Sequence, residues 1–392
     1  MEDLGAGNLP VWGSFETLTK EETIRPAGRS QGSDTFPGEE GRLRFVHDTL
    51  GQRVRFASGG AAEQLAEEVE ECGATRIMVI ASTSRRQLAS DLCRGLPVAA
   101  WHHEVAMHVP ISIAERARAV AAEHYVDLLV SVGGGSTTGL AKAIALTSGL
   151  PIVAVPTTYA GSEVTNVWGV TEANRKTVGS DAKVLPRTIV YDPTLMLSLP
   201  VDISVASGLN ALAHSIDSLW APKANPINAT LACEGVRALR TGLLAVASDP
   251  GGLPGREESL LGAYLSAVAF ASAGSGLHHK ICHVLGGMFG LPHAQTHAVM
   301  IRHVLAFNAP FAPAAKARLA RAFGADTATG GLRSLHEALG APVSLRDIGM
   351  PEQGITTAVG AIVKAVPAGN PTTVTHENLT ALLRAAWKGD LP

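Results

Sequence analysis

Histidines concentrate in residues 278–300 of this chain, which read HHKICHVLGGMFGLPHAQTHAVM and hold five of its 14 histidines. His279 and His283 are four residues apart, as are His293 and His297. Side chains at that spacing share one face of a helix. Imidazoles gathered in this way can bind a metal ion or transfer protons near neutral pH. Packing between helices is the third possible role.

An earlier segment, GLNALAHSID, places Asn210 and His214 four residues apart. With His279 and His293, this pair would form a divalent metal site if position 210 were acidic. The amide of Asn210 is a neutral, weak ligand, so the ion would lack its anionic partner. Lys280 is the cation nearest to these histidines in the sequence. Three further histidines are expected to pack between helices: His278, His297 and His303.

A glycine-rich segment, VDLLVSVGGGSTTGLAKAI, predicts a strand, a loop and a helix in that order. Gly133, Gly134 and Gly135 would let backbone amides approach a pyrophosphate at the N-terminus of the helix. Ser136 could cap this helix or donate to a phosphate. A tight strand-to-helix turn without a ligand is the alternative.

A second loop, PTTYAGSEVTN at residues 156–166, follows the next predicted strand. Its hydroxyl residues Thr157, Thr158 and Ser162 lie where ligands of parallel sheets bind. Together the two loops favour nucleotide binding. They do not distinguish a dinucleotide from ATP, although the Walker lysine motif is absent.

Composition limits the possible partners. The net charge is −3, which gives no electrostatic basis for binding nucleic acid or an anionic membrane surface. The N-terminus lacks the pattern of a signal peptide, and no apolar run reaches the length of a membrane span. The four cysteines are scattered, which is typical of a reducing compartment. We therefore expect a cytoplasmic protein that acts on a small molecule.

The pattern of apolar residues predicts three regions. Residues 1–41 are polar and are expected to form a flexible extension. Residues 42–200 alternate strands and helices, which predicts a Rossmann-like domain with a parallel sheet. Residues 201–392 show only helical periodicity and are expected to form an all-helical catalytic domain. The expected strands are 76–82, 126–132, 151–158 and 188–193, and the expected helices between them include 111–124 and 137–149.

In the segments that carry these glycines, histidines and strands, the chain resembles the iron-containing alcohol dehydrogenase-like superfamily, and within it the maleylacetate reductases. The resemblance rests on GGGSTTGLAKAIAL, PTTYAGSEVT, VLPRTIVYDP, SGLNALAHSIDSLWA, LHHKICHVLGG, LPHAQTHAV and APVSLRDIGMPE, and covers roughly residues 43–392. It implies the dehydroquinate synthase-like fold of this superfamily and a homodimer. It also implies NADH or NADPH as cofactor, with the pyrophosphate at Gly133 to Ser136 and a cofactor contact at Lys176.

The resemblance also implies roles for the histidines. The metal-binding branch has Asp in place of Asn210 and histidines at His214, His279 and His293, whereas the reductase branch has Asn and works without metal. The histidine next to the nicotinamide corresponds to His283. The implied activity is reduction of the conjugated C=C of 2-maleylacetate to 3-oxoadipate, in the degradation of aromatic compounds. His283, His279, His214 and Lys280 are the catalytic candidates.

Some positions depart from the reductase pattern. The family has arginines around VLP, where this chain has Ser180 and Lys183, and NPTT at 370–373 replaces NPRP. Asn166 stands in EVTNVWG where the family has proline, and with Asn210 and His293 it is a candidate for substrate binding. The sequence therefore leaves open a related reductase acting on another unsaturated or keto acid. An iron- or zinc-dependent alcohol dehydrogenase, or a binding protein without activity, is also possible. After the early strand, Ser82 to Ser84 offer no carboxylate to repel the 2′-phosphate of NADPH.

Overall fold

The structure, a computed structural model, describes residues 43–172 and 175–392, without the side chains of residues 175 and 176. The extension predicted for residues 1–41 lies outside the described residues. Within them, no single helix is both long and apolar enough to cross a membrane. Helices Leu253–Ala273 and Leu277–Phe289 meet that test only as a pair, with a bend of 98° between them.

A six-stranded parallel sheet forms the first half of the described chain, which confirms the predicted parallel sheet. Its order is β1-β8-β5-β4-β2-β3. The strands are β1 (Arg53–Phe56), β2 (Ile77–Ile80), β3 (Val98–His102), β4 (Leu128–Gly133), β5 (Ile152–Pro156) and β8 (Thr188–Tyr191). From β2 the chain builds outward to β3 on one side and to β4 on the other. Ligands of open parallel sheets bind beside such a reversal, at the carboxyl ends of the strands.

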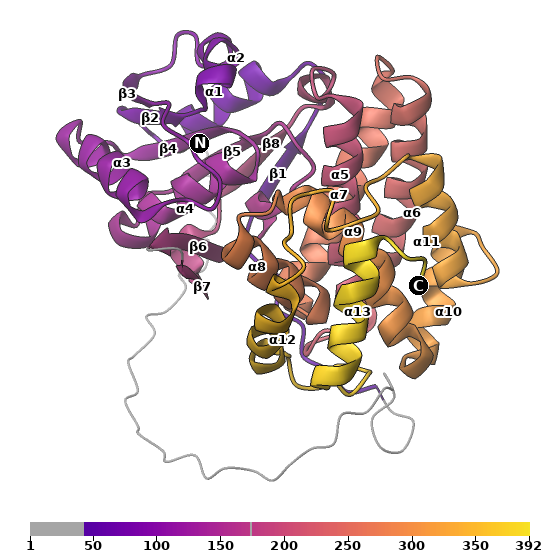
Figure 1. The fold of residues 1–392 in the computed structure, drawn as a ribbon. Helices are drawn as coiled ribbons and strands as arrows, with labels where there is room; N and C mark the ends of the chain where they lie inside the picture. The colour runs from indigo at the N-terminus through magenta and orange to yellow at the C-terminus, as the bar shows by residue number, and fades with distance from the viewer. Residues whose placement is uncertain (1–42, 173–174) are drawn as a thin grey trace, which may run out of the picture. The chain divides into compact units, whose positions relative to one another are not determined.

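Helices cover both faces of this sheet (Figure 1). They are α1 (Ala61–Glu71), α2 (Arg86–Leu92), α3 (Ile111–Glu123) and α4 (Gly135–Ser148). Successive residues of a strand point to opposite faces. Ile77 and Val79 accordingly pack with α1 and α2, while Met78 and Ile80 pack with α3 and α4. Burial on both faces explains why the central strands are continuous apolar runs in the sequence.

The sequence analysis found the central strands β2, β4, β5 and β8 and the helices α3 and α4, but missed four strands. Two of these are β1 and β3, which lie at the edges of the sheet and are partly exposed. Charged and apolar residues alternate in β1 (RVRF), and β3 (VAAWH) is short and includes an exposed tryptophan. The other two form an antiparallel hairpin, β6 (Val167–Glu172) with β7 (Arg175–Ser180).

The second half of the described chain is helical, as predicted. Its helices are α5 (Val201–Ser218), α6 (Pro226–Ser248), α7 (Leu253–Ala273), α8 (Leu277–Phe289), α9 (His293–Asn308), α10 (Pro313–Phe323), α11 (Ala328–Ala338), α12 (Gly354–Ala365) and α13 (His376–Lys388). Helices α5, α6 and α7 pack side by side (Figure 1). From Ser204 to Ser218 every residue of α5 is buried. Polar side chains on α5 are therefore held in the interior, where they need partners.

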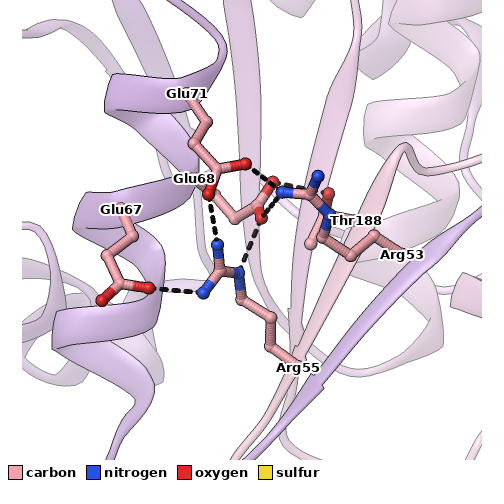
Figure 2. A network of polar contacts seen from close by, with 6 residues as sticks. All are labelled: Arg53, Arg55, Glu67, Glu68, Glu71 and Thr188. Carbon is pink, nitrogen blue, oxygen red and sulfur yellow. Dashed lines mark hydrogen bonds and ion pairs between the residues drawn. The ribbon is translucent and has the colours of Figure 1, made fainter.

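One polar network fixes the edge strand β1 (Figure 2). Glu68 of α1 has a fully buried side chain, which accepts hydrogen bonds from Arg53 (2.8 Å), Arg55 (2.6 Å) and Thr188 (2.7 Å). Burial alone would raise the pKa of the Glu68 carboxyl, but these hydrogen bonds hold the pKa below its usual value. A buried carboxylate of α1 thereby connects β1 to β8.

We expect Glu68→Ala to reduce the free energy of unfolding by about 2 to 4 kcal/mol, because removing one partner of a buried charge network leaves the others uncompensated. Because its folded pKa is lowered, Glu68 stabilises the fold at neutral pH. This contribution falls as pH drops below about 4.5 and vanishes below the folded pKa. Urea denaturation measures both effects. The control is Glu67→Ala, which removes a half-exposed contact to Arg55 and should cost about 1 kcal/mol or less. Equal losses in the two variants would contradict the prediction.

Candidate active site between the glycine loop and the histidine helices

The glycine loop lies at the carboxyl end of β4, as predicted. Gly133 ends the strand, Gly134 is the N-cap residue of α4, and the helix begins at Gly135. Of the two roles suggested for Ser136, capping the helix is contradicted, because Ser136 already lies inside its first turn. Donation to a phosphate stays a prediction. No side chain of the described residues caps α4. Its N-terminus is therefore suited to an anion, which the helix dipole and the first amides attract.

The segment after β5 lies directly against this loop. A Cβ atom added to Gly134 would come within 3.0 Å of Thr158, and one added to Gly135 within 3.4 Å of Ala160. Thr157 is buried and its amide donates to the carbonyl of Gly133 (3.0 Å). Ser162, at 4.0 Å from the same position on Gly135, completes the contact. The two predicted cofactor loops therefore form one surface.

A third segment lies at the same edge of the sheet. Because β2 is hydrogen-bonded to β4, residues 82–84 follow the strand beside the glycine loop. The hydroxyls of Ser82 and Ser84 are 3.0 Å apart. Arg85 donates to Ser198 (2.8 Å). This edge of the sheet thus carries hydroxyl groups and the cation of Arg85. Residues 82–84 include no carboxylate.

Asn210 and His214 lie on one face of α5, as predicted. The Asn210 amide nitrogen donates to the carbonyl of Ala160 (3.4 Å), in the segment that faces the glycine loop. A Cβ atom on Gly161, whose φ is +74°, would come within 3.1 Å of His214. The α5 residues therefore touch the same segment that touches the glycine loop. Burial lowers the pKa of His214 to about 4, so its imidazole is neutral at neutral pH.

His279 of α8 lies parallel to His214, with ring centroids 5.0 Å apart. Phe270 of α7 packs against both rings, at 4.8 Å from His214 and 4.3 Å from His279. This arrangement confirms that α5 and α8 bring two of the predicted histidines together. Among the described residues, Nε2 of His279 has no hydrogen-bond partner.

Asp217 is a functional candidate that the sequence analysis missed. Its fully buried carboxylate is 2.8 Å from Nδ1 of His279 and accepts the amide of Gly276 (2.9 Å) and the indole N–H of Trp220 (3.2 Å). A Cβ atom on Gly276 would lie 2.2 Å from this carboxylate. Asp217 stands three residues after His214 in HSIDSLWA, and that spacing was its one signal in the sequence.

Asp217 controls which nitrogen of His279 carries a proton. Burial raises the pKa of Asp217 to about 6 and lowers that of His279, because it disfavours the charged form of each group. When the Asp217–His279 pair carries one proton, that proton lies between the Asp217 carboxylate and Nδ1 of His279, and Nε2 presents a lone pair. With two protons, the pair has no net charge and Nε2 presents an N–H. The pair can therefore accept or donate a proton at Nε2.

The remaining catalytic candidates, His283 and Lys280, lie on α8, and the substrate-binding candidate His293 is the first residue of α9. His283 is 6.2 Å from His279 and 6.1 Å from His293, measured between ring centroids. All three imidazoles thus lie within one cluster. Lys280 is on α8 and partly buried.

Two histidines assigned to helix packing do pack in the interior. His278 and His297 are fully buried, and Nε2 of His278 is 2.9 Å from Nδ1 of His297. Cys282 lies 3.6 Å from the same Nε2. His303 is also buried.

The resemblance implies four positions at which the metal-binding branch of the superfamily holds its ion. Asn210, His214, His279 and His293 offer one amide oxygen and three imidazoles, so no ligand is anionic. In the described part of the chain, the group of three His, Cys, Asp or Glu ligand atoms that all lie within 4.8 Å of one another comes from His278, Cys282 and His297, and not from those histidines. A divalent ion in this neutral set would be buried without a compensating charge in contact with it.

Two further predicted contacts, Lys176 and Asn166, lie in the β6–β7 hairpin and at its base. The side chain of Lys176 is outside the described residues. Asn166 is partly buried at the base of the β6–β7 hairpin, where its carbonyl accepts the amide of Asp181 (3.0 Å). Thr372, in the segment where the family has arginine, donates to the carbonyl of Phe307 (2.6 Å).

Comparison with known families agrees with this geometry. Residues 52–193 match the model of iron-containing alcohol dehydrogenase, and residues 204–387 match the C-terminal model of the same family. The maleylacetate reductase of Pseudomonas sp. (strain P51) is 44% identical over 352 residues, which are 89% of this chain and 99% of the relative. The maleylacetate reductase of Burkholderia cepacia is 43% identical over 351 residues, 89% of this chain and 99% of the relative.

Solved structures give the same result. An iron-containing alcohol dehydrogenase from Corynebacterium glutamicum is 59% identical, with a TM-score of 0.87, and the match covers 89% of this chain and 98% of that one. Maleylacetate reductase from Rhizobium sp. is 38% identical with a TM-score of 0.83, over 89% of this chain and 99% of that one. The chain is therefore an oxidoreductase that belongs to the iron-containing alcohol dehydrogenase family.

Proposed function

We propose that this protein is an NAD(P)H-dependent reductase of the maleylacetate type, which reduces the conjugated C=C of 2-maleylacetate to 3-oxoadipate. The observation that carries the proposal is the 44% identity to maleylacetate reductases over almost their whole length. The site supports it, because a loop suited to pyrophosphate lies beside a cluster of buried imidazoles. The family implies a nicotinamide cofactor, with Gly133 to Ser136, Thr157, Thr158, Ser162 and Lys176 as its contacts.

When bound at the glycine loop, a nicotinamide cofactor would supply a hydride to one alkene carbon of the enone. The electron pair of the C=C then moves to the carbonyl oxygen, which becomes an enolate, and the other carbon later takes up a proton. The Asp217–His279 pair, in its two-proton state, donates a hydrogen bond from Nε2 to this oxygen. His283 can then deliver the proton to carbon. His214, whose imidazole is neutral at neutral pH, would support the site by packing against the His279 ring.

The substrate contacts are also part of the proposal. Asn210 of α5 and His293, the first residue of α9, would bind the substrate. Asn166 would contact it from the hairpin side, and Lys280 would supply a positive charge to a dicarboxylate.

We further propose that turnover needs no metal. The support is the chemistry of the four ligands, since the amide of Asn210 and three neutral imidazoles offer a divalent ion no anionic contact. The alternative is an iron- or zinc-dependent alcohol dehydrogenase, which the 59% identity to such a protein from Corynebacterium glutamicum supports. A second alternative is a reductase of a different unsaturated or keto acid.

We expect the purified protein to oxidise NADH or NADPH when 2-maleylacetate is added, and to keep that rate after treatment with EDTA. Parallel assays with other enones and with primary alcohols test the alternatives. The matched variant is Asn210→Asp, which adds an anionic ligand without changing the side chain's size. It should bind Zn²⁺ more tightly than the wild type in calorimetry. Loss of activity in EDTA and its return with Fe²⁺ or Zn²⁺ would contradict the metal-free mechanism.

The proposal includes a homodimer in the cytoplasm. The four cysteines are free, which suits a reducing compartment. The homodimer rests on the family resemblance, and light scattering would test it.

A further inference from the structure

Lys142 of α4 is a fully buried lysine with no role in the proposed chemistry. Its ammonium group donates to the carbonyls of Ser162 (2.6 Å), Thr165 (2.7 Å) and Val167 (2.9 Å) and lies 3.0 Å from the hydroxyl of Thr165. An ammonium has three N–H groups, so these oxygens satisfy all of them. One side chain therefore binds the backbone of residues 162–167 at three points.

Those backbone contacts join the two loops that form the cofactor surface. Lys142 belongs to the helix whose N-terminus carries the glycine loop, seven residues after Gly135. The segment that it holds begins with Ser162, which faces Gly135, and follows Gly161, which packs against His214. A shift of residues 162–167 would therefore change both the cofactor surface and the position of His214.

Burial of an ammonium group is unfavourable in free energy, which indicates that the contacts of Lys142 to the backbone are specific. A buried charge is unfavourable unless hydrogen bonds and an opposite charge compensate it. Here burial lowers the pKa of Lys142 to about 7, opposed by the carboxyl of Glu163. Glu163 is itself buried and accepts a hydrogen bond from the hydroxyl of Tyr191 (2.7 Å). An apolar residue would fill the same space in α4, but it could not bind the three carbonyls.

We propose that Lys142 is a positioning residue for the nicotinamide cofactor, which it serves by fixing residues 162–167 against the glycine loop. This inference rests on the proposed function for the place of the cofactor, but not on the identity of the substrate. Lys142 touches neither cofactor nor substrate. It acts through the backbone that does.

The test compares Lys142→Met, which keeps the length of the side chain, with Arg256→Met. Arg256 is a matched control because its fully buried guanidinium also binds four oxygens, those of Ser204, Tyr159, Leu199 and Pro250. Both variants should lose thermal stability. We expect Lys142→Met alone to weaken NADPH binding, measured by fluorescence titration, by about 10-fold or more, and kcat/KM by up to about 100-fold.

Two further measurements separate positioning from general destabilisation. Hydrogen–deuterium exchange should become faster in residues 160–168 of Lys142→Met and remain unchanged in α6. In Lys142→Ala, added propylammonium should restore part of the NADPH affinity, whereas propanol of similar size should not.

The outcomes distinguish the two proposals. Unchanged NADPH affinity in Lys142→Met, with wild-type exchange in residues 160–168, would overturn the role of Lys142 alone. Normal NADPH binding without turnover of maleylacetate would overturn the proposed substrate and leave Lys142 as a positioning residue. A wild-type protein that binds neither NADH nor NADPH would overturn both.

Discussion

Asp217→Asn should lower kcat by about 100- to 10,000-fold, the range that a positioned acid–base group typically contributes. The upper end corresponds to the loss seen when the carboxylate behind a catalytic histidine becomes an amide. In the native protein one oxygen of Asp217 accepts from Gly276 and His279, and the other accepts from Trp220. An amide has one oxygen and one NH₂ group, so it cannot accept on both sides. Either the Trp220 contact is lost, or an N–H faces Nδ1 of His279.

The second arrangement changes the chemistry of His279. If the amide donates to Nδ1, the imidazole must carry its proton at Nε2 permanently. It can then still donate a hydrogen bond to the enolate oxygen, but this bond is weaker, because no neighbouring carboxylate stabilises positive charge on the ring. ¹⁵N NMR of the labelled histidines measures the tautomer directly, and steady-state kinetics measures kcat.

The control for this variant is Asp202→Asn, the same substitution in the exposed first turn of the same helix. It should leave kcat unchanged. If Asp217→Asn folds, binds NADPH normally and keeps kcat within about twofold of the wild type, then Asp217 does not control His279 during turnover, and the proposed mechanism is wrong.

Gly133→Ala should weaken binding of NADH and NADPH by about 100-fold, the size of effect expected when a binding loop is displaced by about 1 Å. The new Cβ atom would lie 2.4 Å from the hydroxyl oxygen and 2.9 Å from the Cβ atom of Thr137. Thr137 is buried in the first turn of α4, so the loop or the helix must move. Either movement disturbs the amides that would bind the pyrophosphate.

Gly149→Ala is the matched control, at the other end of the same helix. Gly149 has φ of +70°, and no heavy atom lies within 4 Å of the added Cβ. This substitution should cost about 1 to 2 kcal/mol of stability through backbone strain and leave cofactor affinity unchanged. Equal affinity of both variants for NADPH, by fluorescence titration, would contradict the assignment of the glycine loop to the cofactor.

Most of the fold could be predicted because the central strands are buried on both faces. Ile77 to Ile80 and Leu128 to Val132 are continuous apolar or small residues, and such runs are visible without a structure. The edge strand β1 could not be predicted in this way. It reads RVRF, and the charges of its two arginines are compensated by carboxylates of α1, Glu68 among them, which a pattern of apolar residues does not show.

The site was predicted only in part, because the sequence shows spacing within one helix but not contacts between elements. The spacing of residues along a helix predicts pairs such as Asn210 with His214. It does not show which groups from other elements contact these pairs. Asp217 acts on His279, 62 residues later, and Lys142 acts on carbonyls, which leave no trace in the sequence. Ser136 was misplaced because helix boundaries depend on the backbone of the preceding glycines, and Gly134 took the cap position.

The space beside Asp217 has a consequence for redesign of this enzyme. A Cβ atom added to Gly276 would overlap the Asp217 carboxylate, so any larger residue at position 276 requires a smaller one at position 217. A smaller residue at position 217 would in turn remove the carboxylate that binds His279. Mutant libraries that vary these positions one at a time would return only inactive clones at both. A search for new specificities should therefore keep the two residues unchanged together and vary other residues around the histidine cluster instead.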